Sequence, residues 1–207
     1  MSIPKSHYFK GRPEVPSRPR TVRLRLASLD LELQADRGVF ASRGVDAGTM
    51  VLLREAPPPP EQGDILDLGC GYGPIAIALA RRAPNARFWA VDVNERALDL
   101  TRANAEAAST ANVAALLPEQ VPPELRFDAI YSNPPVRVGK APLHDLLLGW
   151  LPRLQPGAAA YLVVQRNLGS DSLAAWLGQQ GFEVRRLKSK KGYRILDVRL
   201  RNRGGRP

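Results

Sequence analysis

The sequence predicts an α/β protein with a mostly parallel β-sheet covered by helices on both faces. From residue 64 onward, short apolar runs typical of buried strands alternate with segments whose apolar residues recur at helical spacing. Such alternation is typical of parallel sheets, because each parallel strand must be reached by a crossover connection. The chain ends on two strand-like runs, residues 182–187 and 193–200, which flank a turn at 188–192. These runs predict an antiparallel pair at the end of the sheet.

Seven strands and four helices are expected in this part of the chain. The predicted strands cover residues 64–68, 87–91, 112–116, 127–131, 158–165, 182–187 and 193–200. The predicted helices cover residues 74–83, 94–108, 140–151 and 170–180. We expect these elements to form one domain over residues 61–207.

The first sixty residues are expected to form a short β/α extension. Four prolines interrupt residues 1–20, which predicts an irregular arm. Alternating apolar and polar residues within 22–33 predict a small hairpin. Asp46 is placed to cap a following helix, which a run of four prolines then ends. We therefore expect residues 1–60 to pack on the larger domain.

Composition is ordinary for a globular protein and excludes several classes. The chain has 207 residues, 44% of them hydrophobic, and a single cysteine, Cys70, which excludes an internal disulfide. No stretch approaches the roughly 18 continuous apolar residues of a membrane span. His7 and His144 are the only histidines, so we expect no metal cluster. These features predict a cytoplasmic protein, monomeric or homodimeric, with no membrane segment.

The net charge of +10 is carried by the two ends of the chain. Residues 1–25 hold seven Lys or Arg against one Glu, and residues 185–207 hold ten against one Asp. The 159 residues between them carry a net charge of −5. This segregation favours basic termini that bind a polyanion such as RNA. Solubilising tails or a compositional bias of the source organism are the alternatives.

A glycine turn follows the first strand of the larger domain. Gly69, Gly71 and Gly73 occupy alternate positions, and Pro74 opens the next helix. A strand, a glycine turn and a helix start make a nucleotide site, because glycine lets the ligand approach and the helix offers free N–H groups. The spacing is not that of a dinucleotide fingerprint, and no Gly-Lys-Ser/Thr follows. Asp67 just before the turn suits a cationic ligand, and S-adenosylmethionine is cationic and has no phosphate.

Two further strand ends carry polar residues at the same edge of the predicted sheet. A carboxylate at Asp92 can accept hydrogen bonds from ribose hydroxyls, or it can cap the helix that begins near Asn94. Asn133-Pro134-Pro135 ends the fourth strand, where the prolines remove two N–H donors and leave carbonyls exposed. This combination suits an exocyclic amino group, although a simple proline turn is the alternative.

Together these motifs resemble a known family. Asp67-Leu-Gly-Cys-Gly-Tyr-Gly73, Asp92 and Ser132-Asn-Pro-Pro135 resemble the class I S-adenosylmethionine-dependent methyltransferases that act on amino groups. More narrowly, the loops at residues 38–49 and 133–140 are similar to those of the small-domain methyltransferases, which include bacterial guanine-N2 methyltransferases of 16S ribosomal RNA. The resemblance covers about residues 20–200, and it implies a Rossmann-like sheet of seven strands with a C-terminal antiparallel hairpin.

The resemblance also implies roles for individual residues. The implied cofactor-binding residues are Asp67, Gly69, Cys70, Gly71, Asp92, Val93, Asn112, Val113 and Asn133. The implied catalytic residues, which would hold the target amine in line with the methyl group, are Asn133, Pro134 and Pro135. Val136 cannot stack on a base, so either Phe40 or Tyr193 takes that role or the base is held in another way. We expect Arg137 and Lys140, near the site, to bind phosphates.

We therefore expect an S-adenosylmethionine-dependent N-methyltransferase that acts on an exocyclic amino group of RNA, with guanine N2 of ribosomal RNA as the leading target. A methyltransferase acting on a protein amide or a small amine is one alternative. A non-catalytic RNA-binding protein that retains the fold is the other.

Overall fold

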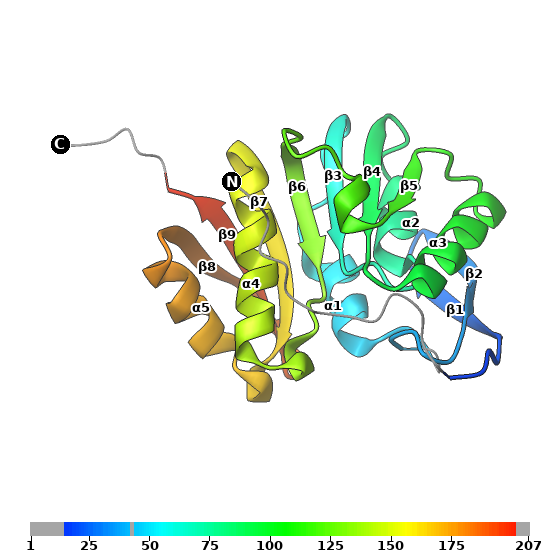
Figure 1. Cartoon of the computed structure of the whole chain (residues 1–207), viewed down its shortest axis with the longest axis horizontal. Coiled ribbons are helices and arrows are strands. Elements are labelled where there is room, and N and C mark those ends of the chain that lie inside the picture. Colours follow the sequence, from blue (N-terminus) through cyan, green and yellow to red (C-terminus); the bar gives the residue numbers. More distant parts are fainter. Residues whose placement is uncertain (1–14, 42–43, 202–207) are drawn as a thin grey trace.

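A computed structural model describes residues 15–41 and 44–201 of the chain. Most of the arm predicted for residues 1–20, the basic residues after 201 and positions 42–43 of the loop before the first helix lie outside the described residues. The described part contains a sheet of seven strands and a separate two-stranded hairpin (Figure 1).

The large sheet has the predicted topology. Its strands are β3 (Gly63–Leu68), β4 (Ala86–Val91), β5 (Val113–Leu116), β6 (Phe127–Ser132), β7 (Leu154–Gln165), β8 (Phe182–Lys190) and β9 (Tyr193–Leu200). The spatial order is β5-β4-β3-β6-β7-β9-β8, as Figure 1 shows from right to left. The first five strands pair in parallel, and β9 pairs antiparallel with both β7 and β8. The mostly parallel sheet with its final antiparallel pair is thereby confirmed.

Helices cover both faces of this sheet, because side chains alternate along each buried strand. In β3, Ile65 packs into one hydrophobic cluster and Leu66 packs into another. The first cluster includes residues of α1 (Ala47–Glu55), α2 (Pro74–Ala80) and α3 (Glu95–Ala107). The second includes residues of α4 (Lys140–Trp150) and α5 (Ser170–Gln179). The molecule is thus a three-layered, doubly wound α/β fold.

The N-terminal hairpin packs against the first helical layer. It consists of β1 (Arg20–Leu26) and β2 (Leu29–Ala35), in which Leu24 and Leu33 are fully buried in the same cluster as α1. The buried Asn104 of α3 accepts a hydrogen bond from Gln34 N at 2.6 Å and donates to Gln34 O at 2.8 Å. A further bond from Asn104 to Tyr72 O, at 2.9 Å, connects the hairpin to the loop after β3.

Three element boundaries differ from the sequence-based expectation by three residues or more. Helix α2 ends at Ala80 and not at residue 83, and Pro84 disfavours helical geometry in Ala83, the residue before it. Strand β8 continues to Lys190, so the turn is the two-residue Lys191-Gly192, in which both φ angles are positive. That geometry matches the right-handed twist of a hairpin. Strand β7 starts at Leu154 and contains an irregularity before its pairing resumes.

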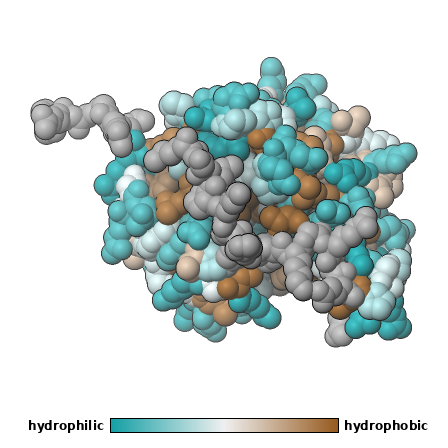
Figure 2. Space-filling view, in the orientation of Figure 1, coloured by the Kyte–Doolittle hydropathy of each residue, from teal (hydrophilic) through white to brown (hydrophobic). Residues whose placement is uncertain are grey.

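Within the described residues, no helix is both long and apolar enough to cross a membrane. Figure 2 shows hydrophilic residues over most of the described surface on this side, with hydrophobic residues gathered in patches near its middle.

Candidate active site

The candidate site lies where the chain reverses its direction of travel across the sheet, between β3 and β6. From β3 the chain moves outward through β4 and β5, and it then returns to place β6 on the other side of β3. Loops that leave two such neighbouring strands diverge and open a crevice. Ser132 Oγ, at the end of β6, donates to Leu68 O at 2.7 Å and holds the two strand ends together.

A pocket of about 460 Å³ occupies this crevice. Its lining includes ten of the residues proposed from the sequence: Phe40, Gly69, Gly71, Asp92, Val93, Asn133, Pro134, Pro135, Arg137 and Tyr193. The turns after β3, β4 and β6 therefore meet in one cavity, as the sequence predicts for the ends of parallel strands.

The glycine turn forms one wall of the pocket. Gly69 and Gly71 have φ angles of 77° and 57°, and nothing lies within 4 Å of the position that a Cβ would take at either residue. Gly73 is different, because a Cβ there would lie 2.9 Å from Thr101. The first two glycines leave space open toward a ligand, whereas the third allows close packing against α3.

Asp92 lies at the end of β4 and faces the same turn. Its Oδ2 accepts a hydrogen bond from Gly71 N at 2.9 Å, and its Oδ1 accepts one from Asn94 N at 2.9 Å. Burial raises the pKa of Asp92, and the backbone N–H donors oppose that rise. Asn94 itself caps α3 through Arg96 N and Ala97 N, so Asp92 remains available to a ligand.

Asp67 lies beneath the turn and does not line the pocket. Its Oδ2 accepts a hydrogen bond from Ala76 N at 2.9 Å, while its buried Oδ1 has no partner among the described residues. Burial, reinforced by the nearby charge of Asp92, raises the pKa of Asp67 to about 7. An unpartnered buried carboxylate oxygen behind the turn fits a cationic ligand on the other side.

Asn133 forms the opposite wall and is held by the first turn of α1. Its Nδ2 donates to Asp46 Oδ1 at 2.7 Å and to Thr49 Oγ1 at 3.1 Å. The carbonyl oxygen of the same amide accepts no hydrogen bond from the described residues. Pro134 O accepts a hydrogen bond from Val136 N at 2.8 Å, so this carbonyl is less open than the sequence suggested. It keeps a second lone pair for a ligand.

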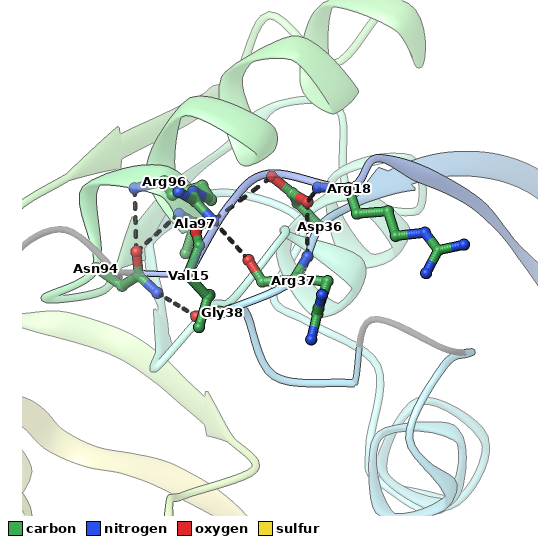
Figure 3. Close-up of polar contacts among 8 residues, drawn as sticks. All are labelled: Val15, Arg18, Asp36, Arg37, Gly38, Asn94, Arg96 and Ala97. Atoms are coloured by element: carbon green, nitrogen blue, oxygen red, sulfur yellow. Dashed lines mark hydrogen bonds and ion pairs between the residues drawn. The ribbon is translucent and has the colours of Figure 1, made fainter.

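The loop that follows β2 lines the pocket and is hydrogen-bonded to residues at the start of α3 (Figure 3). Asn94 Nδ2 donates to Gly38 O at 2.9 Å, and Arg96 donates to Arg37 O at 2.8 Å and to Val15 O at 3.0 Å. Phe40 follows in this loop with 62% of its surface exposed. The anchored backbone therefore presents an exposed aromatic ring at the pocket rim.

Besides Asp67, four predicted site residues lie outside the pocket, which corrects their expected placement. Asn112 and Val113 lie at the amino end of β5, at the edge of the sheet away from the pocket, where Asn112 donates to Ala86 O at 2.9 Å. Strand β5 ends at Leu116, and the nearby Pro118 lines the pocket instead.

Cys70 and Lys140 are the other two. The Cys70 side chain is buried against Thr101, with the sulfur 3.8 Å from Thr101 Oγ1, so burial raises the pKa of its thiol. Lys140 lines a neighbouring cavity of about 240 Å³, beside the stacked rings of His144 and Trp176.

Sequence reasoning missed Asp46 and Asn94 as pocket residues. Both line the pocket, whereas from the sequence Asp46 was expected only to cap a helix and Asn94 only to mark the start of one. Local pattern could identify the caps, because capping depends on the next few residues. It could not show that the same side chains contact strand ends elsewhere in the chain. Among the residues that the structure covers, no group of three or more His, Cys, Asp or Glu is placed to hold a metal ion.

The fold and the site define a class I S-adenosylmethionine-dependent methyltransferase. Residues 30–197 match the model of the methyltransferase small domain, and the chain belongs to this family. The uncharacterized protein YbxB of Bacillus subtilis (strain 168) is 34% identical over 196 residues, covering 93% of this chain and 98% of that protein.

Two relatives have named activities. Ribosomal RNA small subunit methyltransferase C of Shewanella pealeana is 34% identical over 147 residues, which cover 68% of this chain and 42% of that protein. The solved Thermus thermophilus 16S rRNA N2 G1207 methyltransferase (RsmC), in complex with AdoMet and guanosine, has a TM-score of 0.72 at 27% identity. That likeness covers 91% of this chain and 52% of the other. The chain therefore spans about half the length of these ribosomal RNA methyltransferases.

S-adenosylmethionine is the cofactor of this class, and the pocket fits it. The open space over Gly69 and Gly71 accommodates the ligand, and Asp92 can accept the ribose hydroxyls. The unpartnered oxygen of Asp67 suits the positive charge of the methionine moiety.

Proposed function

We propose that the protein methylates an exocyclic amino group of RNA, and that this group is guanine N2 in ribosomal RNA. The observation that carries the proposal is the orientation of Asn133, whose amide nitrogen donates hydrogen bonds to Asp46 and Thr49. The carbonyl oxygen of Asn133 is left to accept a hydrogen bond. This suits a target amino group, because an amino group donates hydrogen bonds. The similar ribosomal RNA small subunit methyltransferase C supports an RNA target, and the similar 16S rRNA N2 G1207 methyltransferase supports guanine N2.

Catalysis in such a site is mainly positioning. Bound S-adenosylmethionine supplies a methyl group on a sulfonium sulfur, which leaves as a neutral thioether. Asn133 Oδ1 and the free lone pair of Pro134 O accept the two N–H bonds of the target amine and aim its lone pair at the methyl carbon. The same two oxygens also stabilise the positive charge that develops on the target nitrogen. As the N–C bond forms, this nitrogen releases one proton to water.

The pocket rim supplies groups suited to a nucleotide. Phe40 is the most exposed aromatic side chain there, and we propose that it stacks on the target base. Arg137 is exposed at the same rim and is placed to neutralise a phosphate. Action on ribosomal RNA would locate the protein in the cytoplasm.

The substrate can be tested by methyl transfer from tritiated S-adenosylmethionine. Naked ribosomal RNA, small ribosomal subunits and total protein from a deletion strain of the source organism are the three acceptors. We expect label in a guanine of the RNA. Label in protein alone would contradict the proposal, and failure to bind the cofactor in calorimetry would indicate a non-catalytic RNA-binding protein.

Replacement of the acceptor amide tests the mechanism. We expect Asn133→Ala to lower methyl transfer by about 100-fold while the affinity for the cofactor stays within about twofold. Asn85→Ala, an exposed position between α2 and β4, is the matched control and should keep normal activity. Full activity of Asn133→Ala would contradict the assigned role.

A further inference from the structure

The first turn of α1 contacts the amide on which the proposed reaction depends. Asp46 caps this helix, because its Oδ1 accepts hydrogen bonds from Gly48 N at 2.8 Å and Thr49 N at 3.2 Å. The same oxygen accepts a hydrogen bond from Asn133 Nδ2 at 2.7 Å. One carboxylate oxygen therefore serves both a helix end and a strand end that is 87 residues away in the chain.

These contacts leave the Asn133 amide only one orientation. A carboxylate oxygen can only accept, so the atom of Asn133 that faces Asp46 must be the nitrogen. Thr49 Oγ1 accepts the second N–H at 3.1 Å. A rotation of the amide by 180° would place its oxygen against the Asp46 carboxylate oxygen, and this contact between two acceptors is unfavourable.

We propose that Asp46 and Thr49 are positioning residues that hold Asn133 with its carbonyl oxygen toward the target, so that the site selects an amino group over a carbonyl oxygen. This inference rests on the proposed function and adds two residues that act on the substrate through Asn133. Donation to a charged carboxylate also polarises the amide and makes its oxygen a stronger acceptor. A keto oxygen, such as O6 of guanine, would meet an acceptor and be rejected.

Helix α1 is suited to this task because it is fixed on the sheet. Val51, Leu52 and Leu53 are buried in the same hydrophobic cluster as Ile65 of β3. Thr49 is itself 4% exposed, so its hydroxyl has little freedom to move. The N-terminal extension thereby supplies part of the site's geometry.

Variants of Asp46 separate positioning from helix capping. Asp46→Ser retains a good capping residue, but its side chain is too short to reach Asn133. Asp46→Asn retains an oxygen that can accept from the helix end and from Asn133, but it removes the charge. Thr49→Val removes the second acceptor with little change of shape. Arg54→Gly is the control, because it destabilises the exposed side of the same helix away from the pocket.

For Asp46→Ser we expect kcat to fall by about 10- to 100-fold, with the cofactor affinity unchanged. The kcat of Thr49→Val and of Asp46→Asn should fall less than that of Asp46→Ser, and Arg54→Gly should keep the wild-type kcat. Wild-type kcat in Asp46→Ser, or an equal loss in Arg54→Gly, would overturn the proposal.

A second measurement does not depend on the methyl acceptor. The side-chain amide signals of Asn133, assigned by their loss in Asn133→Ala, should exchange slowly with solvent in wild type and rapidly in Asp46→Ser. Unchanged protection in Asp46→Ser overturns the positioning role even if RNA is methylated. Conversely, lost protection in a protein that binds the cofactor but labels no RNA upholds the contact and contradicts only the proposed function.

Discussion

Two carboxylates beside the glycine turn have raised pKa values, and both are raised by burial. Asp92 faces the pocket and accepts hydrogen bonds from two backbone N–H groups. Asp67 lies beneath the turn and accepts one. The pKa of Asp67 rises to about 7, and the charge of Asp92 contributes to this rise. At neutral pH the free protein therefore holds Asp67 near the midpoint of its titration.

This pKa predicts a pH-dependent stability. Folded Asp67 keeps its proton up to about pH 7, while the unfolded residue releases it near its ordinary value of 3.8. The unfolding free energy should therefore fall as the pH rises from about 4 to about 7 and stay level above that. Each pKa unit corresponds to about 1.4 kcal/mol, so the total decrease is roughly 2–4 kcal/mol.

Comparison with Asp67→Asn isolates this contribution. Urea unfolding of both proteins at several pH values should show the variant gaining stability relative to wild type between about pH 4 and about pH 7. If the difference in unfolding free energy between the two proteins does not depend on pH, the raised pKa of Asp67 is contradicted. Because ionised Asp67 attracts the cationic cofactor, the variant should also lose the increase in cofactor affinity that wild type shows over this range.

At the scale of elements, the junction between α1 and β9 requires a glycine. A Cβ at Gly48 would lie 2.8 Å from Tyr193 Cε1 and 2.9 Å from Asp46 Oδ1. Tyr193 is the first residue of β9 and lines the pocket, so α1 packs directly against one of its walls. The close approach explains why a helix tolerates glycine in its first turn.

This packing predicts opposite effects for two Gly→Ala substitutions. Gly149→Ala lies in α4, where nothing is within 4 Å of the added Cβ, and it should stabilise the protein by about 1 kcal/mol. Gly48→Ala gains the same helix propensity but must displace Tyr193 or the Asp46 cap, so we expect lower stability and lower methyl transfer. Thermal unfolding and activity of the two variants would check this, and equal stabilisation by both would refute it.

At the scale of the molecule, many basic residues near the two ends are paired with the chain's own carboxylates. Arg23 pairs with Asp30 at 2.6 Å, Arg199 pairs with Asp197 at 2.9 Å, and Lys190 pairs with Glu55. Such exposed pairs add little stability but neutralise charge locally. The positive field of the described residues is therefore weaker than the sequence totals indicate.

The turn between β8 and β9 offers a test of RNA binding through the basic C-terminal region. If Lys188 and Lys191 contact phosphates, the double alanine variant should weaken RNA binding and lower the slope of log Kd against log salt by about 1 to 2. Lys190→Ala is the comparison, with a smaller effect expected because Glu55 already balances its charge. Unchanged RNA affinity in the double variant would exclude this surface.

The sequence alone determined the features that depend on neighbouring residues. Apolar periodicity located every strand and helix of the large sheet, because burial of one face imposes a period within each element. The glycine turn and Asn133-Pro134-Pro135 indicated the cofactor class and an amino target, because these motifs act through their own backbone geometry. The bounds of α2, β7 and β8 were wrong by three residues or more, because apolar periodicity does not mark where an element ends.

Only the tertiary structure decided which side chains reach the pocket. Asn112 was expected to bind the cofactor, but it lies at the amino end of β5, and strand polarity in the sheet places it away from the site. Asp46 was expected only to cap a helix, yet it also holds Asn133, 87 residues away. Such contacts arise from the packing of α1 on the sheet, and no local pattern in the sequence records them.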